Sequence, residues 1–207
     1  IAILFTTTCL IILINGYNFI DGVHGLTILH ATSSIILFNY FSFFILEEQI
    51  SFNSISILLP TLIVLYFQNI RKKIFLGDSG SYYLASIIGL MIINQTLNKD
   101  YSYPYVYASI LIYPAFEVFF SIFRKIYFRK NPLSPDREHL HHLLKNYLEK
   151  KKKISFDKAS ILTGLIINIF VFLFGLISIH FYNHKYILIN NIFLFCFIYL
   201  IFYFWIY

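Results

Sequence analysis

The sequence predicts an all-α protein, a polytopic bundle of transmembrane helices. Three observations support this fold class. Hydrophobic residues make up 58% of the 207 positions, aromatic residues 20% and charged residues only 13%, with a mean hydropathy of +0.71. The apolar residues gather in runs about as long as a membrane-spanning helix. The basic residues gather in two of the segments between those runs, as is typical of membrane proteins and not of soluble domains.

Seven apolar runs divide the chain. Because a bilayer core of about 30 Å requires about 20 apolar residues in a helix, each run is a candidate span. In chain order, the runs cover residues 1–14, 26–46, 55–70, 82–97, 105–123, 159–180 and 186–207. The first begins with the chain itself, so we expect it to be the remainder of a longer span, and the third and fourth are short. We expect about seven spans in one integral membrane domain over residues 1–207.

The basic residues indicate which ends of the predicted spans face the cytoplasm. Fourteen of the sixteen Lys and Arg residues lie in 71–73 and 124–158, and such residues stay on the cytoplasmic side of short loops. Alternation of the spans then places residues 15–25 on the same side. We therefore expect three polar loops, 15–25, 71–81 and 124–158, to share the cytoplasmic face. Positive loops orient membrane proteins whatever their function, so the charge alone predicts no activity.

The second polar loop delivers one carboxylate to the start of an apolar run. Asp78 lies between Gly77 and Gly80, which permit tight or positive-φ backbone. Ser79 and Ser81 are good helix N-cap residues. Asp is itself common at helix starts, so Asp78 taken alone is either a helix cap or a functional carboxylate. The two other polar loops, expected on the same face, favour the second interpretation.

The first polar loop repeats polar side chains at every third position. Asn15, Asn18, Asp21 and His24 would line one side of a helix if the segment is helical. A simple turn would explain Asp21 and the glycine that follows it. Asn and Asp oxygens also suit a hard cation such as Mg²⁺, and the same groups can bind a base edge or a sugar hydroxyl.

The third polar loop contains a histidine cluster. Ser134 or Asp136 can cap a short helix that starts there. On this helix His139 and His142 share a face, and His141 points elsewhere. One histidine pair without a cysteine or a third ligand is a weak zinc signal, and solvated surface histidines are a second alternative. Histidines in a basic loop are better suited to holding phosphate oxygens or to transferring protons near neutral pH.

Glu117 is a carboxylate inside the fifth apolar run. A charge at the bilayer centre costs about 2.5–3.5 kcal/mol, so Glu117 should face the bundle or its cytoplasmic end and have a partner. Arg124, two turns along, or Lys125 could be that partner. We expect a structural ion pair rather than a direct catalytic role.

The three polar stretches together resemble a known enzyme family. Residues 15–26, 75–81 and 134–144 are similar, in this order, to motifs of the polyprenyl-phosphate N-acetylhexosamine-1-phosphate transferases, the bacterial glycosyltransferase family 4. The resemblance implies transfer of a sugar 1-phosphate, of N-acetylglucosamine or a related N-acetylhexosamine, from a UDP-sugar to undecaprenyl phosphate, with release of UMP. It implies Mg²⁺, with Mn²⁺ as a substitute, and a location in the bacterial cytoplasmic membrane. This reaction is the first membrane step of cell-surface polysaccharide synthesis, including that of O-antigen and cell-wall polymers.

The resemblance also implies site residues in the first two polar loops. Asp78 matches the magnesium-binding aspartate, and Asn18 matches an asparagine that holds the metal or the diphosphate. Asp21 matches a position lining the nucleotide site, and we expect it to act in catalysis. His24 stands where many bacterial members have Asp, a position associated with nucleotide recognition.

The histidine loop supplies the remaining implied residues. The resemblance aligns His139, His141 and His142 with a loop that closes over the diphosphate or the sugar, and Arg137 lies beside them. We expect all four to bind substrate, and His139 and His141 to act in catalysis.

Two further expectations concern the whole protein. The family's paired aspartates belong upstream of residue 1, so the resemblance implies that this chain is the C-terminal part of a protein of about eleven helices and is inactive alone. Expected partners are the UDP-sugar, undecaprenyl phosphate and the bilayer, with a homodimer as one assembly and no nucleic acid. Two other functions remain open, a transporter or flippase for a lipid-linked sugar and a binding homologue without activity.

Overall fold

The described part of the chain consists of helices joined by turns. The computed structural model describes residues 2–46, 58–97, 103–132, 134 and 137–207. Its elements are α1 (Ala2–Ile20), α2 (Leu26–Tyr40), the π-helical turn η1 (Phe41–Ile45), α4 (Leu58–Ile70), α5 (Gly77–Leu97), α6 (Pro104–Ile110), α7 (Ile112–Tyr127), α8 (Leu140–Lys150), α9 (Phe156–His180) and α10 (Lys185–Ile206). No strand occurs in these ranges, which confirms the predicted all-α fold class.

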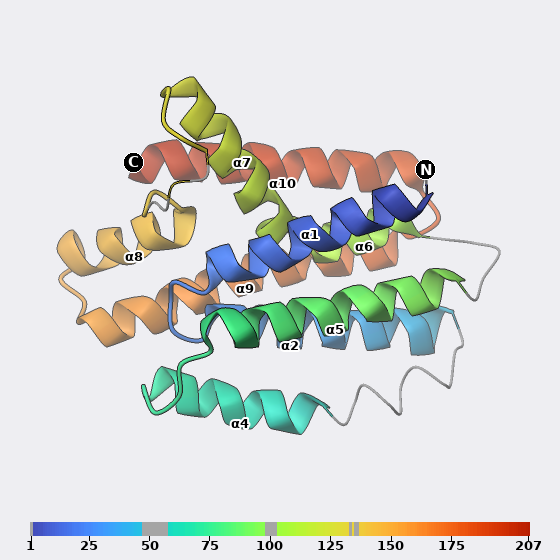
Figure 1. Cartoon of the computed structure of the whole chain (residues 1–207), viewed down its shortest axis with the longest axis horizontal. Helices are drawn as coiled ribbons and strands as arrows, with labels where there is room; N and C mark the ends of the chain where they lie inside the picture. The colour runs from blue at the N-terminus through green and yellow to red at the C-terminus, as the bar shows by residue number, and fades with distance from the viewer. Residues whose placement is uncertain (1, 47–57, 98–102, 133, 135–136) are drawn as a thin grey trace.

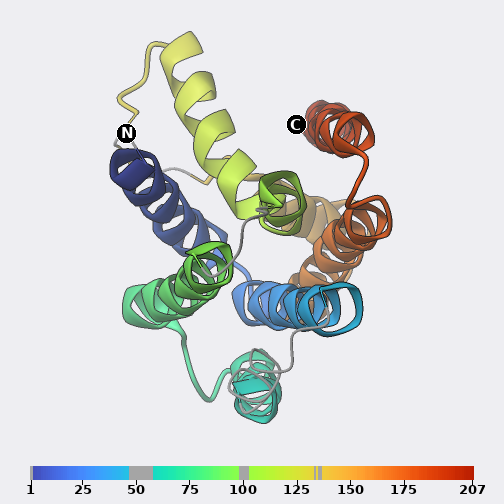
Figure 2. The same ribbon diagram turned by 90° about the vertical axis from the view of Figure 1, so that its right-hand side faces the viewer.

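The long helices pack side by side along one common direction (Figure 1). Helix α1 packs against α5 and α7, whereas α2 packs against α4 and α9, and α9 also contacts α6 and α8. Viewed along the bundle, α4 lies outermost, next to α2 (Figure 2). One apolar core is built mainly by α1, α2, α5 and α6, and a second mainly by α7, α9 and α10.

Four helical segments among the described residues are long and apolar enough to cross a membrane. They are α1, α2 continued by η1, α9 and α10. The bent pair of α6 and α7 adds a fifth span if it crosses as one unit. The predicted runs 55–70 and 82–97 correspond to α4, which has 13 residues, and α5, which has 21 residues but polar ends. Length and composition thus support a membrane bundle with four or five spans, where the sequence predicted about seven.

The predicted fifth span is broken in two. Helix α6 ends at Ile110 and α7 begins at Ile112, with a bend of 77° between them. Pro114 explains the break, because proline has no N–H to donate to the carbonyl of Ile110 and its ring clashes with that turn. Helix α1 approaches closely here, since a Cβ added to Gly16 would lie 2.5 Å from the Pro114 carbonyl oxygen. The break therefore sets where α7, which carries Glu117, meets α1.

The three polar stretches gather at one end of the bundle (Figure 1). The end of α1, the loop between α4 and α5, helix α8 and the start of α9 all lie there. The predicted loop limits change, because residues 15–20 belong to α1, 77–81 to α5, 124–127 to α7 and 156–158 to α9. The convergence expected from the charge pattern is nevertheless present in the fold.

Candidate functional site

Asn18 and Asp78 meet where α1 and α5 come together. Asn18 lies in the last turn of α1. Asp78 lies in the first turn of α5, directly after Gly77, whose φ of 62° favours glycine. Nδ2 of Asn18 donates a hydrogen bond of 2.8 Å to Oδ1 of Asp78. Sixty residues of chain separate the two side chains, so the packing of α1 against α5 creates this pair.

Asp21 adds a second carboxylate beside this pair. It directly follows Ile20, the last residue of α1. Burial raises the pKa of Asp21 to about 6, and the negative charge of Asp78 acts in the same direction. Two carboxylates and one side-chain amide therefore lie at the same end of α1 and α5.

Asn69, which the sequence reasoning missed, ties these two motifs together. Its side chain is buried at the end of α4. Oδ1 of Asn69 accepts a hydrogen bond of 2.7 Å from the N–H of Gly25, and Nδ2 donates one of 3.0 Å to the carbonyl of Ile74. Gly25, with a φ of 80°, ends the turn that contains Asp21, and Ile74 lies in the loop that leads to Asp78. The sequence did contain a signal for this role, because Asn69 is an amide at the end of the apolar run 55–70, just before the basic residues 71–73.

The turn between α1 and α2 has a second anchor. The backbone N–H of His24 donates a hydrogen bond of 3.0 Å to Oγ of Ser160 on α9. The imidazole of His24 lies 6.2 Å from the exposed ring of Phe75. Burial lowers the pKa of His24, and the charge of Lys72 acts in the same direction. A neutral imidazole beside an exposed aromatic ring can stack on and hydrogen-bond a planar base.

The histidine loop meets the Asp21 turn at Gly22. A Cβ added to Gly22 would lie 2.4 Å from Cε1 of His142 and 3.2 Å from Nε2 of His141. The His141 ring is 4.4 Å from the ring of His142 and stacks at 5.5 Å on that of His139. The prediction that His141 points away from the other two is therefore wrong. Burial lowers the pKa of His142 to about 3, so this ring is neutral at pH 7.

Helix α8 begins at Leu140, with His139 as its N-cap residue. The prediction that Ser134 caps this helix is wrong, since Ser134 lies upstream in a separate turn, and Asp136 lies outside the described residues. The carboxylate of Glu117 accepts the Leu140 N–H at 3.2 Å. A side chain of α7 thus takes the place of a local cap and sets where α8 starts.

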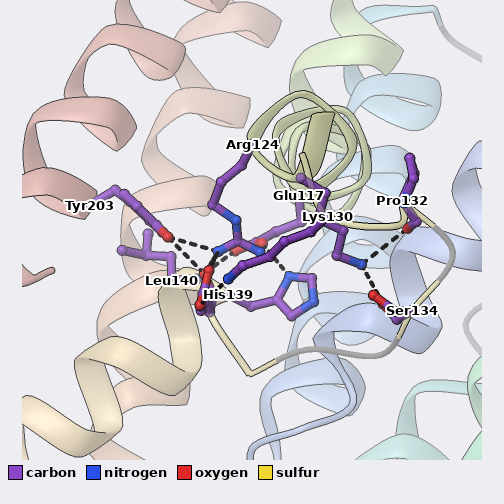
Figure 3. A network of polar contacts seen from close by, with 10 residues as sticks. Glu117, Arg124, Lys130, Pro132, Ser134, His139, Leu140 and Tyr203 are labelled. Carbon is purple, nitrogen blue, oxygen red and sulfur yellow. Dashed lines mark hydrogen bonds and ion pairs between the residues drawn. The ribbon is translucent and has the colours of Figure 1, made fainter. Parts of the chain in front are cut away.

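Glu117 pairs with the histidine loop. It is fully buried, and its Oε2 lies 2.9 Å from Nδ1 of His139 (Figure 3). Its Oε1 lies 3.8 Å from Nδ1 of His141. Arg124 and Lys125, on the same helix, bind elsewhere. The prediction that Arg124 or Lys125 is the partner of Glu117 is therefore wrong, because its partner is His139.

Arg124, labelled in Figure 3, and Lys125 hold the segment that precedes α8. Arg124 donates a hydrogen bond of 2.7 Å to the hydroxyl of Tyr203 and another to the carbonyl oxygen of Glu138. Nζ of Lys125 donates to two main-chain carbonyls within 132–134, at 3.1 and 2.6 Å. Both cations are buried, so the carbonyl oxygens satisfy groups that water does not reach.

The structure brings most of the predicted site residues to one end of the bundle. They are Asn18, Asp21, His24, Asp78, His139, His141 and His142. Arg137 lies two residues before His139, but its side chain is exposed and makes no hydrogen bond or ion pair with another described residue.

The oxygen atoms at this end fit a hard cation only in part. In the described ranges, no group of three or more His, Cys, Asp or Glu side chains could hold a metal ion, which gives the zinc alternative no support. Mg²⁺ needs fewer protein ligands, because it is usually held by one or two carboxylates plus water and substrate phosphates. Asp78, with Asn18 and Asp21 nearby, meets that requirement.

The chain is similar to known bacterial proteins. The family model described as glycosyl transferase family 4 matches residues 1–96. The chain is 31% identical over 160 residues to the undecaprenyl-phosphate alpha-N-acetylglucosaminyl 1-phosphate transferase of Thermotoga maritima, which covers 74% of this chain and 48% of that relative. It is 28% identical over 170 residues to the probable undecaprenyl-phosphate N-acetylglucosaminyl 1-phosphate transferase of Bacillus subtilis, over 80% of this chain and 44% of the relative.

A third relative extends the same pattern. The undecaprenyl-phosphate alpha-N-acetylglucosaminyl 1-phosphate transferase of Escherichia coli K12 is 27% identical over 136 residues, which are 63% of this chain and 37% of the relative. The chain thus spans about half the length, or less, of these relatives. No solved structure matches the chain. The chain is therefore similar to glycosyl transferase family 4 over residues 1–96 and to these transferases over most of its length.

Proposed function

We propose that this chain contributes the metal and phosphate site of a membrane enzyme. The enzyme transfers N-acetylglucosamine 1-phosphate, or the 1-phosphate of a related N-acetylhexosamine, from a UDP-sugar to undecaprenyl phosphate and releases UMP. The observation that carries the proposal is the meeting of the Asn18–Asp78 pair, the Asp21 turn and the histidine rings at one end of an apolar bundle. The relatives' names supply the lipid acceptor and the sugar.

The position of this site suits one lipid substrate and one soluble substrate. A polyprenyl chain stays in the bilayer, beside helices such as α1 and α10 whose apolar side chains are exposed. A UDP-sugar reaches the polar end of the bundle from water. We place that end in the cytoplasm of a bacterium, because basic residues concentrate there and such residues stay on the cytoplasmic side.

Asp78 and Asn18 would hold Mg²⁺, with Asp21 close to it. The amide of Asn18 would then turn its oxygen towards the cation, since Nδ2 now donates to Asp78. When bound, the cation neutralises charge on the diphosphate of the donor. Mn²⁺ would bind the same oxygen ligands.

The chain's own groups position the phosphates and handle the proton. His141 and His142 cover Gly22, so phosphate oxygens bound at the Asp21 turn would lie beside their ring nitrogens. The carboxylate of Asp21 lies beside the Asn18–Asp78 pair, where it can accept the remaining proton of the attacking lipid phosphate. The attacking oxygen then displaces UMP in line at the sugar-linked phosphorus.

The test measures UMP release by the protein at its natural length, in membranes with undecaprenyl phosphate, Mg²⁺ and a panel of UDP-sugars. We expect release that requires both lipid and metal. Asp78→Asn should lose activity by about 10²-fold or more, because a preorganised charge at the reacting phosphate is removed. The matched control is Asp157→Asn, an exposed carboxylate paired with Lys72 at the same end, which should stay close to wild type. If no UDP-sugar yields UMP, or if Asp78→Asn keeps the wild-type rate, the proposal is wrong.

A further inference from the structure

Glu117 is a buried carboxylate that the proposed reaction leaves without a role. It lies in α7 and is fully buried, close to the site yet away from the Asn18–Asp78 pair. An ionised group in such a position is costly unless several hydrogen bonds compensate it. The hydrogen-bond partners of Glu117 therefore indicate which groups it positions.

The hydrogen bonds of Glu117 lead to the start of α8, and the hydroxyls of Tyr113 and Tyr199 also lie beside its carboxylate. Oε2 lies 2.9 Å from Nδ1 of His139, and Oε1 accepts the N–H of Leu140 at 3.2 Å. Oε1 also lies 3.8 Å from Nδ1 of His141. The carboxylate thus fixes the first residue of α8 and faces the same nitrogen, Nδ1, of two histidine rings.

The neighbouring cations do not compete for this carboxylate. Arg124 donates to the Tyr203 hydroxyl and to a main-chain carbonyl, and Lys125 donates to two main-chain carbonyls. A carboxylate accepts hydrogen bonds and donates none, so Nδ1 of His139 must carry the proton in its contact with Glu117. In a neutral ring this places the lone pair on Nε2.

His141 presents its other nitrogen to the site. Its Nδ1 lies 3.1 Å from the hydroxyl of Tyr113, on the side of Glu117. Its Nε2 is buried, makes no hydrogen bond with any described residue, and lies 3.2 Å from where a Cβ on Gly22 would stand. A buried polar atom without a partner is costly, so a ligand atom at the Asp21 turn would satisfy it.

We propose that Glu117 is a positioning residue that keeps the protons of His139 and His141 on Nδ1, so that the lone pair of Nε2 of His141 is aimed at a hydroxyl group of a sugar phosphate bound at the Asp21 turn. This inference rests on the proposed function for the identity of the ligand. A carboxylate that accepts a hydrogen bond from one ring nitrogen of a histidine fixes the orientation of the ring and the position of its proton, and it does so without contacting the substrate.

The tautomer of His141 provides a test that does not depend on activity. Histidine ring nitrogens labelled with nitrogen-15 would be observed by solid-state NMR for the protein in lipid bilayers, and the His141 signals would be assigned by their loss in His141→Asn. We expect a protonated Nδ1 on His141, with a proton position that changes in Glu117→Gln. A wild-type His141 protonated on Nε2 alone, with Nδ1 accepting from the Tyr113 hydroxyl, would overturn the proposal.

Kinetics provide the second arm. Glu117→Gln should lower kcat/KM for the UDP-sugar by about tenfold or more, and the double variant with His141→Asn should be no slower than His141→Asn alone, because both changes remove one function. Losses that multiply in the double variant would mean that Glu117 does not act through His141. Glu138→Gln is the matched control, since its carboxylate pairs with Lys130 and lies 3.6 Å from Arg124. If the NMR result holds while no UDP-sugar yields UMP, the positioning stands and the proposed function alone fails.

Discussion

Replacement of Asn69 tests whether one buried amide holds the two carboxylate motifs in register. Asn69→Ala removes the acceptor of the Gly25 N–H and the donor to the Ile74 carbonyl. Gly25 is buried, and a Cβ on it would lie 2.6 Å from the Tyr66 ring, so little water can replace the lost acceptor. An unsatisfied buried N–H costs about 1–3 kcal/mol. Asn69→Asp keeps that acceptor, but it loses the second hydrogen bond, which is worth about 0.5–1.5 kcal/mol, and places a carboxylate oxygen against the Ile74 carbonyl oxygen at a buried position.

The expected order of stability is therefore wild type first, with both Asn69→Asp and Asn69→Ala below it. For a chain of this size, 1 kcal/mol corresponds to about 2–4 °C in Tm. Thermal melting in detergent, followed by far-ultraviolet circular dichroism, measures this order. UMP release well below Tm should also fall by about tenfold or more in Asn69→Ala, because misplacement of catalytic groups by about 1 Å is already costly.

The neighbouring amide is the control for Asn69. Gln68→Ala removes a half-buried side chain that makes no hydrogen bond with other described residues, so its Tm and activity should stay near those of wild type. Wild-type melting and turnover in Asn69→Ala, or an aspartate variant as stable as wild type, would refute the reasoning.

Three further predictions concern the same end of the bundle. Gly22→Ala should lower UMP release by about tenfold or more with little change in Tm, because the new Cβ would lie 2.4 Å from the movable ring of His142. As the pH rises from about 4 to about 6, the Tm of the metal-free protein should fall more in wild type than in Asp21→Asn. Burial raises the pKa of Asp21 to about 6, so the stability that its protonated form contributes is present below the unfolded pKa and is lost as the pH rises through the folded pKa. Equal pH profiles of the two proteins would contradict this. Lys72→Ala should cost no more than about 1 kcal/mol in denaturant unfolding, since its ion pair with Asp157 is half-exposed, and a larger loss would show a role beyond that pair.

Some features of the site could be predicted because short segments of sequence carry them. The distribution of basic residues places three polar stretches at one end, and alternation of apolar runs is enough for that inference. Asp78 stands out because a glycine and an apolar run bracket it, and Asn18 because it is polar at the end of a span. The break after Ile110 had a local signal as well, in Pro114.

Other features depended on contacts between distant residues. The start of α8 was predicted from local capping rules, yet Glu117, 23 residues before Leu140, supplies the acceptor. Arg124 and Lys125 were the natural partners of Glu117 by helical spacing, but main-chain carbonyls of a nearby segment bind both. Spacing along one helix states which side chains could meet, and it does not include acceptors brought by other segments.

The sequence by itself determined the all-α membrane fold class, the shared end of the three polar stretches and the identity of Asn18 and Asp78 as a candidate pair. The first two follow from composition and charge, and the candidate pair follows from the resemblance of two short motifs to a known family. Only the tertiary structure decided that Asn69 joins the two carboxylate motifs, that three histidine rings cluster with two of them beside Gly22, and that Glu117 faces this cluster. The physical reason is that a buried polar atom takes whatever partner the packing of distant helices brings within hydrogen-bond distance.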